Sequence, residues 1–330
     1  MPSASRLKTA TSSETEEMSR QTKAKCCSIL TWKLAEMKNF FYGLLIKLGY
    51  KVENIKKAKS AIETGLQRFD VLQNKNLLFR AHRYIENINR EFPDLSISDS
   101  GEGVLVSFSG LKIYVESAEE FFIINEVFIE KDYNFLTPAD CILVDIGANI
   151  GISSLYFSRI SSVRKIYAFE PVADTFSQAK ENFARNGKND TIAVENIGLG
   201  NSSRRETFIF NKMMKGNTGL RGKLSKSYAQ AQEYDERPVQ IEDADGVFRR
   251  IISENPREKI VVKMDCEGAE YEIIGRLSET NLLGNIHAFL IEWHDKGAAS
   301  IEQPLRDAGF FVFSRQLTPE SGMIYCVKNH

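Results

Sequence analysis

Hydrophobic residues from position 140 onward follow two alternating patterns. Short apolar runs of strand length are separated by segments in which apolar residues recur every three or four positions. Alternating strands and helices predict a doubly wound, mostly parallel sheet with right-handed crossovers. The expected strands are 142–145, 165–170, 191–199, 259–265 and 288–293, the expected helices are 173–186, 243–252, 269–277 and 301–308, and a terminal hairpin is expected at 310–314 and 323–327.

The first 139 residues show three other patterns. A polar start rich in Ser, Thr and Glu has almost nothing to bury, and helix-forming residues with apolar positions at helical spacing follow it. Apolar and polar residues then alternate on each side of Ser109 and Gly110, as in a β-hairpin, and a helix is expected at 118–129. The predicted organisation is a disordered tail (1–22), a helical extension (23–95), a β-hairpin and helix cap (96–139) and a main domain (140–330) with a polar insertion (201–237).

The apolar stripe of Phe41, Leu44 and Leu48 has two interpretations. It is typical of core or dimer packing, and it also suits a helix on a membrane surface or against a partner. We expect the helical extension to support a homodimer or to shape an acceptor pocket. No run is long enough to span a bilayer, and the N-terminus lacks a signal pattern.

Charge and cysteine content narrow the class of protein. The net charge of −1 gives no reason to expect nucleic acid as the main partner. Five cysteines are scattered without the spacing of a zinc site or a disulfide framework. A reducing, cytoplasmic location is therefore predicted.

The central motif of the chain is the stretch 142–157, with the sequence ILVDIGANIGISSLYF. It predicts a buried strand ending at Asp145, a turn with Gly147, Asn149 and Gly151, and the start of a helix. Glycines in such a turn let backbone approach a ligand closely, and the helix N-terminus favours an anionic group. A tight strand-to-helix turn needs glycine even without a ligand, so the turn alone does not define a binding site.

Glu170 closes the next strand and adds a second signal. A carboxylate at that distance after the turn accepts the ribose hydroxyls of a nucleoside. The dinucleotide fingerprint G-x-G-x-x-G would need glycine where this chain has Asn149 and Ile152, which disfavours NAD and an oxidoreductase. The pattern D-x-G-x-N-x-G instead suits a smaller ligand with a carboxylate and an ammonium group, and S-adenosyl-L-methionine fits that description.

Five motifs in order carry a family resemblance: VDIGANIG, YAFEP, NIGLG, VKMDCEGAE and IEWH. Together they resemble the FkbM-type S-adenosylmethionine-dependent methyltransferases, over about residues 126–327. The resemblance implies a class I, Rossmann-like fold, a seven-stranded sheet with an antiparallel last strand, and O-methylation of a hydroxyl on a sugar or natural product. The partner would be a small-molecule or glycan acceptor. A non-catalytic binding or scaffold protein that keeps the fold remains an alternative.

Within this framework each strand end receives a role. Asp145 and the backbone from Gly147 to Gly151 would hold the methionine part, Glu170 the ribose, and Gly198 with Leu199 the adenine. The expected cofactor-binding residues are Asp145, Gly147, Asn149, Gly151, Glu170, Pro171, Gly198, Leu199 and Asp265.

Asp265, His294 and Lys263 are the expected catalytic residues because the acceptor should approach the methyl group near their strand ends. Each has a structural alternative: Asp265 as a helix cap, Lys263 as the partner of a carboxylate, and His294 as a structural histidine. With Glu267 and Glu292, Asp265 and His294 also have the ligand types for a divalent metal, but no metal is assigned.

The insertion is rich in Lys and Arg. The simplest interpretation is a solvated loop, whereas its length raises the possibility of a lid suited to a phosphorylated or acidic acceptor. Its basic residues are Arg204, Arg205, Lys212, Lys215, Arg221, Lys223 and Lys226.

Overall fold

The computed structural model describes residues 55–135, 137, 139–225, 228 and 233–328, together with Met37, Phe40, Phe41, Leu44, Lys47 and Leu48. The chain divides into two units, residues 1–62 and 63–330. The predicted tail lies outside the described residues, whereas the stripe residues Phe41, Leu44 and Leu48 are described. Phe40, Phe41, Leu44 and Leu48 are exposed, and helix α2 (Ile55–Leu66) runs across the boundary of the two units.

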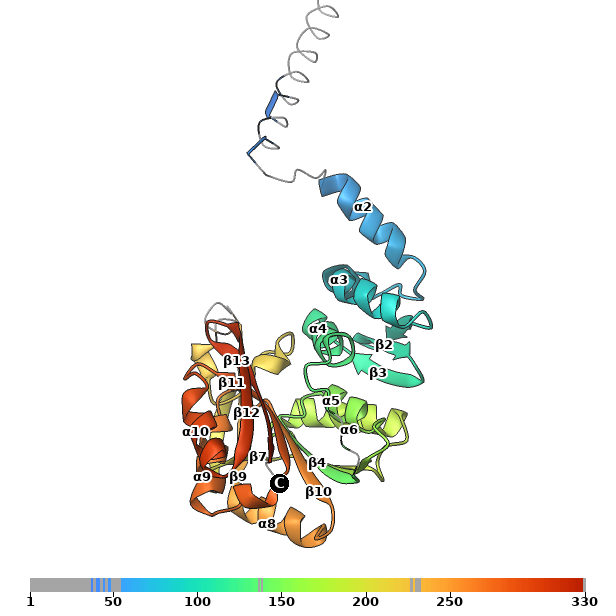
Figure 1. Ribbon diagram of the computed structural model, residues 1–330. Helices are drawn as coiled ribbons and strands as arrows, with labels where there is room; N and C mark the ends of the chain where they lie inside the picture. The colour runs from blue at the N-terminus through green and yellow to red at the C-terminus, as the bar shows by residue number, and fades with distance from the viewer. Residues whose placement is uncertain are drawn as a thin grey trace, which may run out of the picture. The chain divides into compact units, whose positions relative to one another are not determined.

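A seven-stranded sheet forms the centre of the second unit, in the order β12-β13-β11-β10-β4-β5-β6 (Figure 1). Six strands run in the same direction, and the seventh, β13, runs antiparallel to its neighbours β11 and β12. The predicted fold class, with its antiparallel last strand, is confirmed. The strands are β4 (Cys141–Ile146), β5 (Val163–Phe169), β6 (Ile192–Glu195), β10 (Lys259–Met264), β11 (Ala288–His294), β12 (Phe310–Thr318) and β13 (Ser321–Lys328).

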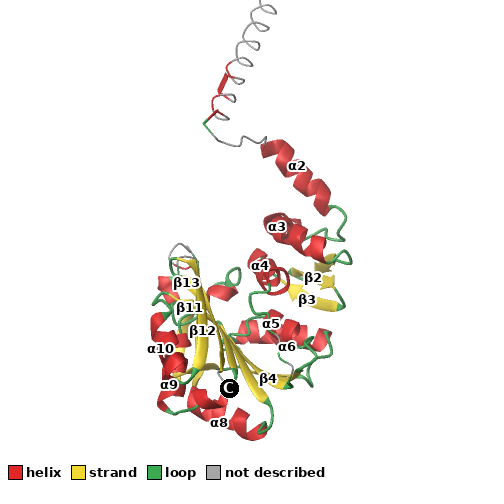
Figure 2. Cartoon of the chain, in the orientation of Figure 1, coloured by secondary structure: helices red, strands yellow, loops and turns green. Residues whose placement is uncertain are grey.

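Helices cover both faces of this sheet (Figure 2). Leu143 packs into the hydrophobic core on the side of α5 and α6, whereas Ile142 and Val144 pack into the core on the side of α8, α9 and α10. Strands buried on both faces leave their carboxyl ends as the open edge for a ligand. The helices are α5 (Ile152–Phe157), α6 (Ala173–Arg185), α8 (Ala244–Glu254), α9 (Glu270–Glu279) and α10 (Ala299–Asp307), with a 3₁₀ turn at Leu283–Asn285.

The residues before β4 form α3 (Lys75–Glu91), a small sheet and a further helix. The expected hairpin is present as β2 (Gly103–Phe108) and β3 (Leu111–Val115), and β1 (Ser96–Ser100) adds a third strand. Its turn places Ser109 and Gly110 at positive φ, as two-residue hairpins favour. The expected helix at 118–129 begins as α4 (Ala118–Ile124), capped by Ser117 and Glu120, and continues as the π-helix η1 (Asn125–Glu130).

A third sheet has the order β7-β9-β8. It shows that two expectations from the sequence were wrong. The single strand expected at 191–199 is two strands in different sheets, β6 and β7 (Gly198–Gly200). The insertion is not a polar loop: it contains β8 (Arg204–Phe210), the start of β9 (Asp235–Asp243) and 3₁₀ turns at Lys215–Asn217 and Gly222–Leu224. Phe208 and Phe210 are buried and pack with Val172, Val239 and Ile241. The charged residues at the start of β8 hid a half-buried strand.

Candidate functional site

Two adjoining cavities lie at the carboxyl ends of β4, β10 and β11. The larger has a volume of about 460 Å³ and the narrower about 50 Å³. The glycine turn and the end of β10 form the wall between them, because Gly147, Asn149, Asp265 and Glu267 line both. The strand ends predicted to meet therefore do meet.

The turn after β4 requires its glycines. Gly147 has φ +78°, and a Cβ there would lie 1.8 Å from the carbonyl oxygen of Asp265. Gly151 has φ +87°, and a Cβ there would lie 2.4 Å from the Phe183 ring. The amides of Gly147 and Ala148 both donate to the Phe169 carbonyl at 3.0 Å. The turn is thus held tightly against β5 and β10, with Asn149 also in the left-handed region at φ +51°.

Asp145 has a different place from the one expected. It is fully buried and lines neither cavity. Its carboxylate accepts hydrogen bonds from Ser153 Oγ at 2.7 Å and Ser154 Oγ at 2.6 Å, and Lys263 Nζ lies 3.2 Å away. The physical reason is strand register: Asp145 and Lys263 are directly opposed on β4 and β10. Asp145 therefore anchors the first turn of α5. Gly151 lies outside both cavities and allows that turn to pack against Phe183.

Lys263, expected to be catalytic, is held in this structural pair. Its ammonium donates to the Gly147 carbonyl at 2.8 Å and lies 3.9 Å from Asp265 Oδ2. Burial lowers the pKa of Lys263, but Asp145 and Asp265 outweigh burial and hold the pKa above its ordinary value. A lysine that stays charged cannot take a proton from an acceptor, so Lys263 positions the turn and Asp265.

Glu170 lines the narrower cavity together with Pro171, Gly198 and Leu199. Its side chain is buried and accepts hydrogen bonds from the amide of Asn149 at 3.0 Å and that of Val172 at 2.9 Å. Burial raises the pKa of Glu170 to about 7. Two backbone amides thus fix the carboxylate, and each oxygen keeps a lone pair for a further donor.

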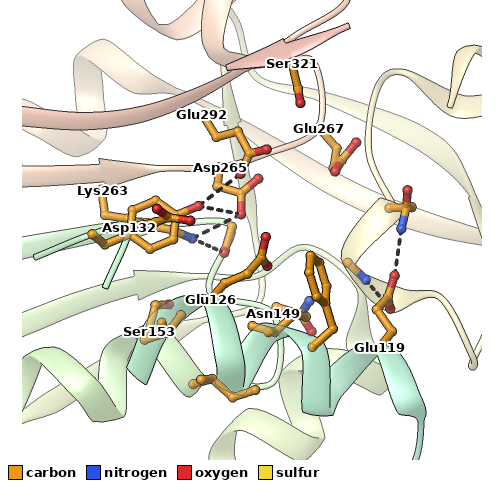
Figure 3. A pocket seen from close by; sticks show the side chains of 18 of the residues that line it. Glu119, Glu126, Asp132, Asn149, Ser153, Lys263, Asp265, Glu267, Glu292 and Ser321 are labelled. Carbon is orange, nitrogen blue, oxygen red and sulfur yellow. Dashed lines mark hydrogen bonds and ion pairs between the residues drawn. The ribbon is translucent and has the colours of Figure 1, made fainter. Parts of the chain in front are cut away.

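Two carboxylates share one tyrosine in the larger cavity (Figure 3). The Tyr133 hydroxyl lies 3.2 Å from Asp265 Oδ2 and 3.2 Å from Glu292 Oε2. Burial raises the pKa of Tyr133 well above its ordinary value and that of Glu292 to about 8, with Asp265 adding to both. A neutral tyrosine has one proton, so it can donate to only one of the two carboxylates at a time. The other is left to accept a proton from elsewhere.

His294 is a buried cation in this arrangement. Nδ1 lies 2.9 Å from Glu270 Oε1, and Nε2 lies 3.4 Å from Glu267 Oε1 and 3.7 Å from Glu292 Oε1. Burial lowers its pKa, but the hydrogen bond to Glu270 and the surrounding carboxylates prevail and raise the pKa to about 10. A histidine already protonated at neutral pH does not act as the general base, which departs from the expected catalytic role.

Asp265, Glu267 and His294 also have ligand atoms within 4.8 Å of one another. Their ligand types suit a divalent ion. However, Glu267 is already paired with Arg221 Nη1 at 2.8 Å as well as with His294. The charges of this group are thus matched by side chains of the chain itself, and we assign it no metal.

Several lining residues carry no motif and were missed from the sequence. Glu119, Glu126 and Tyr133 enter the larger cavity from the segment before β4, and Asn217 and Arg221 enter it from the insertion. The sequence offered one signal for those of the segment before β4, namely that charged and aromatic residues come shortly before that strand. Their convergence depends on packing across the sheet edge.

Four basic residues of the insertion, Arg204, Lys212, Lys215 and Arg221, are paired with carboxylates. Lys212 pairs with Glu102 at 2.6 Å and Glu116 at 3.4 Å. Arg204 contacts Glu206 at 2.8 Å and Glu272 at 2.9 Å. Their charges are therefore used within the chain. Lys226 lies outside the described residues.

The strand order, the glycine turn and the carboxylate after β5 define the class I group of S-adenosylmethionine-dependent methyltransferases. A family model described as Methyltransferase FkbM domain matches residues 145–312. The chain belongs to the FkbM methyltransferase family, and S-adenosyl-L-methionine is its cofactor.

Relatives by sequence include proteins named as methyltransferases. Methyltransferase sdnD from Sordaria araneosa is 29% identical over 233 residues, covering 63% of this chain and 89% of that protein. Hexuronic acid methyltransferase AglP from Haloferax volcanii is 29% identical over 193 residues, covering 57% of this chain and 72% of that protein.

Among solved structures, a putative tRNA (m1A22) methyltransferase of Streptococcus pneumoniae in complex with S-adenosyl-L-methionine is similar at a TM-score of 0.37. It has 15% identity and covers 60% of this chain and 70% of that one. A likeness of this size says nothing about the acceptor. Within the part of the chain that the structure describes, every helix is too short or too polar to cross a membrane.

Proposed function

We propose that the protein transfers the methyl group of S-adenosyl-L-methionine to a hydroxyl oxygen of a sugar or natural product. The observation that carries this proposal is the joining of two cavities at Asp265. One holds a fixed carboxylate suited to ribose, and the other holds a proton-accepting pair. The Haloferax volcanii relative, named as a hexuronic acid methyltransferase, supports a sugar acceptor.

The residues of the narrower cavity fit the nucleoside. Glu170 would accept the ribose hydroxyls, and Pro171, Gly198 and Leu199 would lie against adenine. Gly198 and Leu199 are buried on β7, and a Cβ at Gly198 would lie 2.7 Å from Ile241. Residues 215–220 border the same space and would move to admit the base, because about 50 Å³ is smaller than an adenosine. The Gly147–Asn149 backbone and Asp265 would hold the methionine part.

The cofactor supplies an electrophilic methyl on a positively charged sulfur. The task of the chain is to align the acceptor oxygen with that methyl and to accept one proton. As the oxygen–carbon bond forms and the carbon–sulfur bond breaks, the hydroxyl proton would go to the carboxylate of the pair that is ionised. Because the pKa of Glu292 is about 8, that carboxylate is Asp265 at neutral pH. Neutral S-adenosylhomocysteine is released. In this proposal Asp265 keeps the catalytic role expected from the sequence. Its partner in that role is Glu292, where the sequence analysis had expected His294.

Calorimetric titration with S-adenosylmethionine and S-adenosylhomocysteine tests the cofactor assignment. Glu170→Ala should weaken both at least about tenfold, because a charged hydrogen bond contributes roughly 1.5 to 3 kcal/mol. Glu195→Ala is the matched control, since Glu195 ends the neighbouring strand β6 and lines neither cavity. Equal affinity of the wild type and Glu170→Ala would refute the ribose assignment.

Two further parts of the proposal concern assembly and location. The helical extension is proposed to form a homodimer, which analytical ultracentrifugation of the full chain and of a chain lacking residues 1–54 would test. A cytoplasmic location remains a prediction from the sequence, and fractionation of cells expressing the tagged protein would test it.

A further inference from the structure

Carboxyl groups far outnumber cations on the wall of the larger cavity. Carboxylates enter it from the cap side at Glu119, Glu126, Glu130 and Asp132, and from the strand ends at Asp265, Glu267 and Glu292. The cations that line it are Lys263, Arg221 and His294. The carboxylates therefore outnumber the cations of the same wall by more than two to one.

The lining cations are also shared with carboxylates outside the cavity. Lys263 is paired with Asp145, and His294 with Glu270. Arg221 contacts Asp295 at 2.8 Å as well as Glu267. The three cations thus serve the carboxylates of the strand ends and those outside, and none of them pairs with a carboxyl group of the cap side. Arg315, which does not line the cavity, contacts Asp132.

Glu126 is the centre of this excess. It lies on the π-helix η1, an irregular turn of a kind common at functional sites. Among the described residues no cation pairs with it, whereas Glu292, Asp265, Asp132 and Glu130 all repel its charge. Burial together with these neighbours raises the pKa of Glu126 to about 9. In Figure 3 its side chain points into the same space as Asp265 and Glu292.

An anionic acceptor would be repelled by the carboxylates of this wall. A cation between Glu126 and Glu292 would instead lower their raised pKa values and take the place of the protons that these two groups otherwise hold. We propose that the acceptor is an amine-bearing hydroxyl compound, such as an amino sugar or amino alcohol, whose ammonium lies between Glu126 and Glu292 while its hydroxyl faces Asp265. This inference rests on the proposed methyl transfer. It makes Glu126 a specificity-determining residue, and it sets this chain apart from a hexuronic acid methyltransferase, whose acceptor is an acid.

The test uses three cofactor analogues that extend into the acceptor space. In each, a nitrogen replaces the sulfur of S-adenosylhomocysteine and carries a 3-aminopropyl, a propyl or a 2-carboxyethyl arm. The adenosine and amino-acid parts are identical, so differences in affinity report only the end of the arm. Calorimetry on the full chain gives the dissociation constants, with S-adenosylhomocysteine as the reference.

We expect the aminopropyl analogue to bind at least about tenfold more tightly than the propyl analogue, and the carboxyethyl analogue to bind most weakly. Glu126→Gln and Glu292→Gln should each shrink the preference for the amine. Glu279→Gln, at a side chain that is 72% exposed and lines neither cavity, should preserve it.

Equal affinity for the amine and propyl arms, tighter binding of the carboxylate arm, or exclusion of the amine while S-adenosylhomocysteine binds would each overturn the acceptor class. Failure of S-adenosylhomocysteine itself to bind would overturn the proposed function instead. The two failures are therefore separable in one set of titrations.

Discussion

Replacing Glu126 by glutamine should stabilise the protein. The carboxyl group has a pKa of about 9 in the folded chain against an ordinary value of 4.5, because it is buried beside Glu292, Asp265, Asp132 and Glu130. At pH 7 the folded state therefore keeps a proton that the unfolded chain releases. A carboxyl pKa that is raised by folding favours the folded state below the unfolded value, and that contribution is lost as pH rises toward the folded value.

The size of the expected stabilisation follows from the difference between the pKa of Glu126 in the folded chain and its ordinary value. Each pH unit above the unfolded value costs about 1.4 kcal/mol, so the penalty at pH 7 is roughly 3 kcal/mol and it continues to grow toward pH 9. Glutamine has nearly the same shape and does not titrate. Glu126→Gln should thus match the wild type near pH 4 and exceed it by an amount that increases with pH.

Urea unfolding at pH 5, 6, 7 and 8, followed by intrinsic fluorescence, measures this difference in the free energy of unfolding. Glu279→Gln serves as the control, because an exposed carboxylate should change stability by less than about 0.5 kcal/mol at every pH. A difference between Glu126→Gln and the wild type that stays flat with pH, or a less stable variant at pH 8, would refute the account. A residue that is present although it destabilises the folded protein is typical of a functional site.

Three other outcomes are expected. Affinity for S-adenosylhomocysteine should rise as pH increases through about 7, because a protonated Glu170 can accept fewer hydrogen bonds. Calorimetry at pH 6 and 8 would detect this change, and equal affinity at the two pH values would contradict it. Gly147→Ala should unfold at markedly lower temperature, since its Cβ would lie 1.8 Å from the Asp265 carbonyl oxygen, and calorimetric scanning would measure the loss. Lys263→Met should cost about 3–5 kcal/mol of stability by leaving Asp145 buried without its cation, and the double variant with Asp145→Asn should recover part of it; an equally unstable double variant would argue against the pair.

The sequence was most informative where structure depends on neighbouring residues. The strand, turn and helix around residues 142–157 are set by a short apolar run and by glycines that no other residue can replace, so they could be predicted. The place of Glu170 just after β5, on the wall of the narrower cavity, followed from its distance along the chain. Its support by the amides of Asn149 and Val172 required knowing how the turn folds back.

What could not be predicted depends on register and distant packing. Lys263 opposes Asp145 only because β10 pairs with β4 in one register. His294 is charged because Glu270, on another element, lies beside Nδ1. Tyr133 lies far in sequence from both carboxylates that it contacts. The strands of the insertion were hidden by their charges, which are matched by partners that the sequence does not identify.

The buried lysine of the insertion has a consequence for recombination between relatives. Lys215 is 5% exposed and lies 2.7 Å from Glu116 and 2.9 Å from Glu120, just before and within α4. The following residues, Gly216 and Asn217, donate to Glu119. A chimera that exchanged the insertion alone would leave these carboxylates without their hydrogen-bond donors. The insertion and the segment 116–124 therefore form one unit of exchange, and a family that varies its acceptor by replacing the insertion must replace both together.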